Sequence, residues 1–288
     1  MTPTDKKFVG AFENGFDGCV LVSDLDGTLI GNGESISDDN IAAIRAFVAE
    51  GGRFLGATGR TELSVIPFTR GLPLSLPWIL YNGAAIYDWA SRRFLYKAPL
   101  DRGLAEAFTR RVMERLPKVN IQVYCGGPFC QVSAGAPSDI IATREGQALV
   151  DKPLEAIADD WLKVLFCSDF PDELDAIETL FESDALRGKA HKMRSAARYF
   201  EFTALGVTKG SALARLRALL DPAPKCVVAI GDYINDIEML DEADIAAAPE
   251  SAHDAVKRRA DIVTADHTQN AVADLLRRLR RLGETRFP

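Results

Sequence analysis

The chain has 288 residues, of which 47% are hydrophobic and 26% are charged, values typical of a soluble globular protein with one large domain or two ordinary ones. Its formal net charge of −7 argues against a nucleic-acid-binding surface, and no apolar run reaches the ~18 residues that a membrane helix needs. The five cysteines are scattered and the polar start does not resemble a signal peptide, so we expect a cytoplasmic protein with reduced thiols.

Residues 1–18 are expected to form a loosely held extension. The apolar run 20–23 then predicts a buried strand of a parallel sheet that ends at Asp24, in the sequence Asp24-Leu25-Asp26-Gly27-Thr28. Ser37 is expected to cap a helix with two aspartates in its first turn, which the helix dipole favours. A second strand, 53–57, is followed by Thr58-Gly59-Arg60, and a third, 78–81, by Asn82-Gly83. Strands alternating with helices predict a doubly wound parallel sheet.

The pattern changes near residue 88. A hairpin is expected over 85–96, helices over 101–116 and 171–182, and strands at 120–124, 130–133 and 163–168. Residues 198–202 alternate like an exposed edge strand. We therefore predict a smaller α+β domain over 89–194, inserted into a core domain formed by 1–88 and 195–288.

The parallel pattern resumes at Thr208-Lys209-Gly210, which opens a helix that ends near residue 220. A buried strand over 226–230 is followed by Gly231-Asp232-Tyr233-Ile234-Asn235-Asp236. Residues 245–248 and 262–263 are expected to form edge strands. The last helix turns its leucines inward.

Four segments thus place polar side chains at the carboxyl ends of strands or at a helix start. These are Asp24 with Asp26, Thr58, Lys209, and Asp232 with Asp236. Alone, each is compatible with an ordinary turn or helix cap. In a parallel sheet, however, such ends share one rim where ligands bind, so we expect them to converge. Carboxylates suit Mg²⁺, while a hydroxyl and an ammonium group suit phosphate oxygens.

Geometry suggests the catalytic roles. Asp24, the last residue of its strand, is best placed to attack phosphorus in line and form an aspartyl-phosphate. Asp26, two residues on, is then expected to protonate the leaving alkoxide and later to deprotonate the attacking water. Arg60 is a candidate for contacting the substrate or the inserted domain.

The four segments resemble the four signature motifs of the haloacid dehalogenase-like (HAD) hydrolase superfamily. The insert is similar to the C2-type cap of its Cof-like sugar-phosphatase branch, subclass IIB, and Asn82-Gly83 resembles that branch's motif before the cap. The resemblance implies an α/β fold with a Rossmann-like core and a cap, Asp24 as nucleophile, and Mg²⁺ held by Asp24, the Asp26 carbonyl and Asp232. The predicted phosphate- and substrate-binding residues are Thr58, Gly59, Arg60, Asn82, Lys209 and Asn235; the predicted metal residues are Asp24, Asp26, Asp232 and Asp236.

These observations predict a Mg²⁺-dependent phosphatase acting on a small phosphorylated metabolite such as a sugar phosphate, as a monomer or a homodimer. A phosphomutase or phosphotransferase on the same fold is one alternative, and a non-catalytic phospho-ligand-binding protein is another. Carbon–halogen hydrolysis is disfavoured because it needs neither a second aspartate nor a metal.

Overall fold

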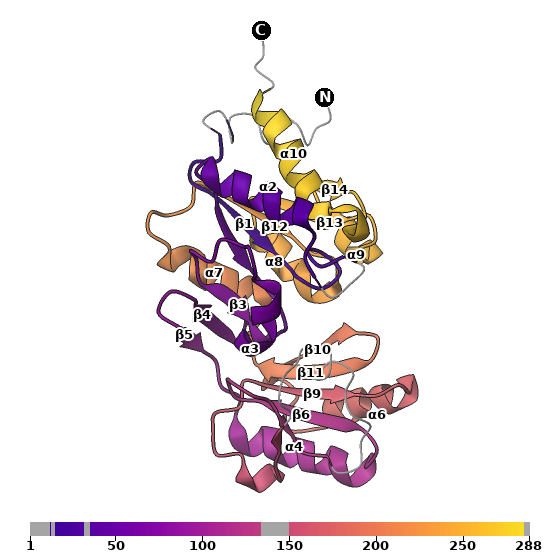
Figure 1. Cartoon of the computed structure of the whole chain (residues 1–288). Helices are drawn as coiled ribbons and strands as arrows, with labels where there is room; N and C mark the ends of the chain where they lie inside the picture. The colour runs from indigo at the N-terminus through magenta and orange to yellow at the C-terminus, as the bar shows by residue number, and fades with distance from the viewer. Residues whose placement is uncertain (1–11, 13–14, 32–34, 134–149, 285–288) are drawn as a thin grey trace.

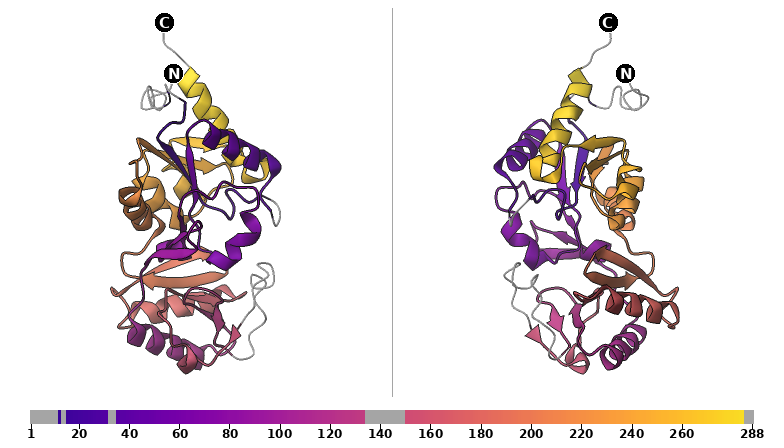
Figure 2. Two further views of the ribbon diagram at one scale, coloured as in Figure 1. Left: turned by 60° about the vertical axis from the view of Figure 1, so that its left-hand side comes forward. Right: turned by 90° about the vertical axis from the view of Figure 1, so that its right-hand side faces the viewer.

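The computed structural model describes residues 12, 15–31, 35–133 and 150–284. Three sheets organise this part of the chain: a five-stranded parallel sheet, a six-stranded sheet and a three-stranded sheet (Figure 1). The parallel sheet lies in one lobe and the six-stranded sheet in the other (Figure 2). In the described residues, none of the helices combines the length and the apolar character that crossing a membrane requires.

The first lobe is built on parallel strands that are buried on both faces. Their spatial order is β14 (Ile262–Thr264), β13 (Ile245–Pro249), β12 (Cys226–Ile230), β1 (Cys19–Ser23) and β2 (Arg53–Gly56). All four ladders are parallel. Strand β13 therefore lies inside the sheet, which corrects the prediction that both it and β14 are edge strands.

Helices cover both faces of this sheet. Helices α2 (Asp38–Ala49) and α10 (Ala271–Glu284) lie on one side; α7 (Lys209–Leu219), α8 (Ile237–Glu242) and α9 (Asp254–Lys257) lie on the other (Figure 2). The predicted cap of α2 is confirmed, because the Ser37 side chain accepts a hydrogen bond from the Asn40 amide at 3.1 Å. The doubly wound parallel sheet is confirmed as well.

The N-terminal segment is held more firmly than predicted. Phe12 and Phe16 are 4% and 1% exposed, and the Phe16 ring lies 4.7 Å from the ring of Phe47 in α2. Removing two aromatic rings from water favours this packing by the hydrophobic effect. The loosely held extension is therefore wrong for these residues, while 1–11, 13 and 14 lie outside the described residues.

The third predicted strand leaves the parallel sheet. Strand β3 (Trp78–Leu80) pairs with β4 (Ala85–Asp88), which in turn pairs with β5 (Arg93–Lys97), in an antiparallel sheet. A parallel bridge between Ala57 and Ile79 joins β3 to the end of β2. The physical reason is the turn after β3. Tyr81 and Asn82 both have positive φ, 54° and 55°, which reverses the chain at once.

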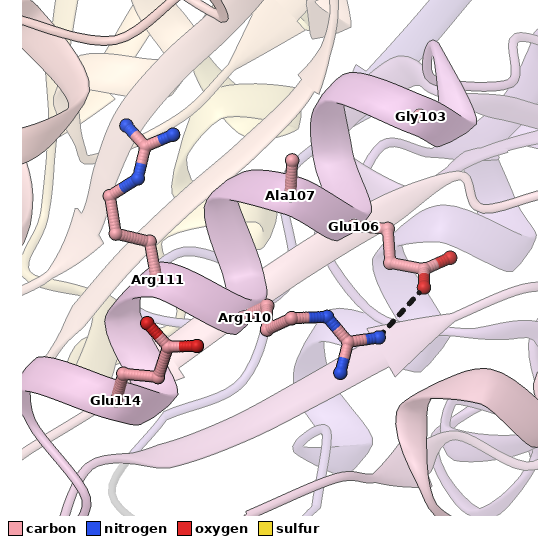
Figure 3. Close-up of a pocket in the computed structure, with 6 residues that line it drawn as sticks. All are labelled: Gly103, Glu106, Ala107, Arg110, Arg111 and Glu114. Atoms are coloured by element: carbon pink, nitrogen blue, oxygen red, sulfur yellow. Dashed lines mark hydrogen bonds and ion pairs between the residues drawn. The ribbon is translucent and has the colours of Figure 1, made fainter.

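The second lobe contains the six-stranded sheet. Its spatial order is β10 (Ala190–Ala196), β11 (Tyr199–Ala204), β9 (Lys163–Cys167), β6 (Asn120–Tyr124), β7 (Cys130–Gln131) and β8 (Val150–Asp151). Helices α4 (Arg102–Arg115) and α6 (Pro171–Glu182) cover one face and enclose a separate apolar core (Figure 1). Helix α4 is a surface helix: Phe108 points into that core, while Glu106 and Arg110 pair at 3.0 Å on the outer face (Figure 3).

Strand β11 does not lie at an edge. It pairs with β10 on one side and with β9 on the other, so the predicted edge strand over 198–202 is in fact internal. Residues 190–204 form a ribbon that continues this second sheet, whereas the predicted domain boundary falls within the ribbon, at residue 194. The alternation of residues 198–202 did not reveal the extra strand β10, because β10 carries few apolar residues.

Candidate active site

Asp24 lies where β1 leaves the parallel sheet. Its backbone amide still donates to the Ile230 carbonyl of β12 at 2.9 Å, so the residue is held in register with the neighbouring strand. Beyond it the chain turns: Gly27 has a φ of 78°, and a Cβ there would lie 2.5 Å from Oδ2 of Asp232. Only glycine fits this close approach. The carboxylate of Asp24 therefore faces Asp232 across the turn.

Lys209 connects the segments at the centre of the site. It is the first residue of α7, whose start is capped by Thr208 and Ser211. Its Nζ donates to Oδ1 of Asp24 and to Oδ1 of Asp236, each at 2.6 Å, and the side chain is 2% exposed. A buried cation between two carboxylates fixes both of them. The structure thus brings together three of the four predicted segments at one ammonium group.

The loop after β12 is held by Asp236. Its Oδ2 accepts hydrogen bonds from the amides of Asp232 and Tyr233, at 3.0 and 3.1 Å. Oδ1 of Asp232 accepts from the hydroxyl of Thr28 at 3.1 Å. Both oxygens of Asp236 are therefore occupied by protein donors, and Asp232 is the residue of this loop that is presented to the Asp24 side.

Carboxylates gather here at high density. In the described residues, Asp24, Asp232 and Asp236 form a cluster whose ligand oxygens lie within 4.8 Å of one another. Burial raises the pKa of Asp24 well above its ordinary value, and the nearby Lys209 cation offsets this rise only in part. Burial and the neighbouring Asp236 raise the pKa of Asp232 to about 7. Burial by itself would lower the pKa of Lys209, but Asp236 and Asp24 outweigh it and raise that pKa. Such a cluster attracts a proton or a cation.

The segment after β2 contributes a hydroxyl group and a guanidinium group. Thr58 is 1% exposed, and its Oγ1 accepts from the Arg60 amide at 3.2 Å. The Arg60 guanidinium donates to both carboxylate oxygens of Asp26, at 2.8 and 2.6 Å. The Asp26 side chain is 55% exposed and lies outside the carboxylate cluster. In this structure the Arg60 guanidinium therefore pairs with Asp26, and a contact of Arg60 with the substrate or the inserted domain stays a prediction.

Asn82 lies between the two lobes rather than at an exposed position. It is 1% exposed; its Nδ2 donates to Oε1 of Glu201 at 2.8 Å, and its Oδ1 accepts from Nδ2 of Asn235 at 3.1 Å. Both predicted residues, Asn82 and Asn235, thus lie beside the site, bonded to each other. Gly59 is adjacent, since a Cβ there would lie 2.9 Å from Nδ2 of Asn82.

Apart from Thr58, which is buried, the predicted site residues line one cleft of about 620 Å³ between the lobes. Its floor carries Asp24, Lys209 and Asp232, and its other wall comes from the six-stranded sheet. The wall residues that the sequence did not single out are Tyr124, Lys163, Leu165, Arg198, Tyr199 and Glu201. The sequence carried no signal for Glu201: in the alternation of 199–203 it falls on the polar side with Tyr199 and Thr203, which predicts an exposed residue, yet it is 1% exposed.

Comparison with known proteins agrees with this arrangement. The family model described as haloacid dehalogenase-like hydrolase matches residues 21–276. The 5-amino-6-(5-phospho-D-ribitylamino)uracil phosphatase YcsE of Bacillus subtilis is 29% identical over 258 residues, covering 90% of this chain and 94% of that protein. The pyridoxal phosphate phosphatase YbhA of Escherichia coli is 27% identical over 270 residues, covering 89% and 97%.

A similar fold is found among solved structures. A haloacid dehalogenase-like hydrolase from Bacteroides thetaiotaomicron superposes with a TM-score of 0.79 at 25% identity, covering 92% of this chain and 99% of that one. The family-model match, residues 21–276, spans both lobes and all four motif segments. The chain belongs to the haloacid dehalogenase-like hydrolase family, in the Cof-like branch that its motifs resemble.

Proposed function

We propose that this chain, a phosphatase of its family, hydrolyses the phosphate monoester of a small metabolite, such as a sugar phosphate, through an aspartyl-phosphate on Asp24. The observation that carries the proposal is the Lys209 ammonium, which bridges Asp24 and Asp236 at 2.6 Å each on the floor of the cleft. An ammonium group in this place fixes the nucleophile and offsets the charge of an incoming phosphate.

The reaction has two half-reactions. An oxygen of Asp24 attacks phosphorus while the bond to the leaving alkoxide breaks, and Asp26 supplies the proton that the alkoxide takes up. Water then attacks the aspartyl-phosphate, Asp26 accepts its proton, and inorganic phosphate leaves. Lys209 holds Oδ1 of Asp24, so we assign the attack to Oδ2. Asp26 must exchange its Arg60 partner for the leaving oxygen, and Arg60 is then available to the phosphate.

The cofactor we propose is Mg²⁺. The donor set fits it, because carboxylate oxygens within 4.8 Å of one another are hard ligands of the kind that Mg²⁺ prefers. Asp24 and Asp232 would hold it, while Asp236 supports the loop; the backbone carbonyl of Asp26 stays a predicted ligand. When bound, the ion supplies Lewis-acid neutralisation of phosphate oxygens.

Metal affinity should depend on pH in a defined direction. The pKa of Asp232 is raised to about 7, so below that value a proton competes with the cation for the carboxylate. We expect the apparent Mg²⁺ affinity to increase by about tenfold per pH unit for each proton displaced up to about pH 7, and less steeply above it. Calorimetric titration across this range measures it, with Asp232→Asn as the variant that should bind weakly throughout. An affinity independent of pH would contradict the assignment.

We propose that the six-stranded lobe is the C2-type cap that selects the substrate. Strand pairing supports an insert that runs from residue 89 to the end of β11 at 204, ten residues beyond the predicted boundary at 194. Its sheet forms a wall of the cleft, whose volume of about 620 Å³ suits a small molecule. Burial of all five free cysteines supports a reducing, cytoplasmic location. A monomer or a homodimer remains our proposal for the oligomeric state.

A panel of substrates tests the function. Sugar phosphates, nucleotides and phosphorylated cofactors are incubated with the protein and Mg²⁺, and inorganic phosphate is measured. We expect release from one group of small monoesters, loss of that release on chelation, and restoration by Mg²⁺. Conversion of a sugar phosphate without net phosphate release would instead indicate a phosphotransferase.

A further inference from the structure

The six-stranded sheet has two unlike faces. Val164, Phe166 and Phe202 belong to the apolar core under α4 and α6. The opposite face of the sheet is turned toward the first lobe. In the strand pairing, Tyr124 lies opposite Lys163, and Glu201 lies opposite Leu165, which is two residues after Lys163 in β9. Because side chains alternate along a strand, Tyr124, Lys163 and Glu201 share this second face. It is buried, with exposures of 6%, 3% and 1%.

Lys163 and Glu201 form an ion pair on this face. The Lys163 Nζ lies 2.9 Å from Oε2 of Glu201 and 4.4 Å from the centre of the Tyr124 ring. Each partner also reaches the first lobe. Lys163 donates to the Gly59 carbonyl at 2.9 Å, and Glu201 Oε1 accepts from Nδ2 of Asn82 at 2.8 Å. The pair therefore bonds to two points of the core, both within the candidate site.

Asn82 and Gly59 lie next to each other, and the turn at Asn82 contacts the predicted phosphate-binding segments. The backbone amide of Asn82 donates to the Thr58 carbonyl at 3.0 Å, and the side-chain oxygen of Asn82 accepts from Nδ2 of Asn235 at 3.1 Å. The next residue, Gly83, packs so closely that a Cβ would lie 2.1 Å from the carbonyl oxygen of Thr208, which precedes Lys209. The turn at Asn82 thus contacts the segments of Thr58, Lys209 and Asn235, and its left-handed conformation needs outside support.

Stability alone is a poor reason for this ion pair. Burying two charges costs desolvation that their attraction scarcely repays, and two well-packed apolar residues are often as stable or more so. Other ion pairs of this lobe, such as Arg111 with Asp184, connect elements within the lobe itself. Lys163 and Glu201 instead direct their remaining polar contacts across the cleft.

We propose that Lys163 and Glu201 are positioning residues, which act through Asn82 and Gly59 to hold Thr58 and Lys209 in the geometry needed for phosphoryl transfer. The inference rests on the proposed function, since it assigns these two cap residues a part in that reaction. It makes turnover dependent on the seated cap, because the contacts with Asn82 and Gly59 exist only when the two lobes are together.

The test removes the pair without leaving a buried charge behind. We expect Lys163→Met/Glu201→Leu to stay folded, with a kcat toward p-nitrophenyl phosphate in Mg²⁺ that is lower by about 10²-fold, the cost of a misplacement near 1 Å. KM should change much less. Lys163→Met/Glu201→Gln retains an oxygen for Asn82, so its kcat should recover part of the loss. The matched control, Arg111→Met/Asp184→Asn, removes another ion pair of this lobe and should leave kcat unchanged.

A second readout does not depend on activity. Amide hydrogen exchange of peptides that contain residues 81–83 reports the donor amides of Asn82 and Tyr81, which bond to the carbonyls of Thr58 and Arg60. Peptides that contain residues 57–61 report the donor amides of Thr58 and Arg60. We expect faster exchange there in Lys163→Met/Glu201→Leu, and unchanged exchange in the control. A folded Lys163→Met/Glu201→Leu variant with wild-type kcat would overturn the proposal. If the wild type releases no phosphate, the proposed function fails by itself, and unchanged exchange would then overturn the positioning role.

Discussion

Asp24→Asn is expected to reduce phosphate release by on the order of 10⁴-fold or more, with the chain still folded. An amide oxygen does not attack phosphorus, but asparagine has the shape of aspartate and can still accept the hydrogen bond from Lys209. Burial raises the pKa of Asp24, which means that the folded protein disfavours the ionised carboxyl group. The neutral amide should therefore melt at a temperature at least as high as the wild type when no divalent cation is present.

Asp184→Asn is the control for this variant. It makes the same chemical change at a carboxylate whose side chain is 3% exposed, in the ion pair with Arg111 outside the cleft, and it should keep wild-type turnover. Rapid quenching of the wild type during turnover, followed by peptide mapping, should place acid-stable phosphate on the Asp24 peptide. Turnover by a folded Asp24→Asn protein would remove the covalent route from consideration.

The second large effect is expected from Lys209→Met. Methionine has a similar length, yet the substitution leaves Asp24 and Asp236 buried without their shared cation. Removing one partner of a buried ion pair costs about 3–5 kcal/mol of unfolding free energy, and phosphate release should fall to background because the phosphate loses its ammonium partner. Denaturant unfolding at neutral pH without divalent cations measures the loss.

The loss should depend on pH and on metal. Burial raises the pKa of Asp24, and without Lys209 this carboxyl group ionises still less readily in the folded chain, so its unfavourable contribution appears above the unfolded pKa and diminishes as the pH falls. The variant should thus approach wild-type stability in acid, and Mg²⁺ should restore part of it at neutral pH. Lys189→Met, at an exposed lysine of the other lobe, should change nothing. Wild-type stability of Lys209→Met at neutral pH would show that the two carboxylates do not depend on the cation.

The side chains on the floor of the cleft were predictable because their pattern is encoded locally. Five or six consecutive residues are enough to predict each segment: a buried strand that ends in Asp24, a threonine after a strand, and a lysine that begins a capped helix. The parallel sheet then converts separate strand ends into one rim, which is why Asp24, Lys209 and Asp236 meet. Their contact was expected without any knowledge of the distances.

The fold was predictable to the same extent, and its prediction failed where local patterns are ambiguous. The apolar run at 78–80 predicts a strand, but not that positive φ at Tyr81 would turn it into a hairpin. Alternation in 199–204 is equally consistent with an edge strand and with an internal one. Only the pairing of β10 with β11 decided between them.

By itself, the sequence determined the parallel α/β core, the four motif segments and the identity of the groups on the floor of the cleft. The tertiary structure alone decided the partner of Asp26, the place of Asn82 between the lobes, and the place of Lys163 and Glu201 in the cleft wall. The physical reason is separation along the chain: Glu201 and Asn82 are 119 residues apart, and Lys163 and Gly59 are 104. No short-range pattern encodes a bond between such residues, because it forms only when the two lobes pack against each other.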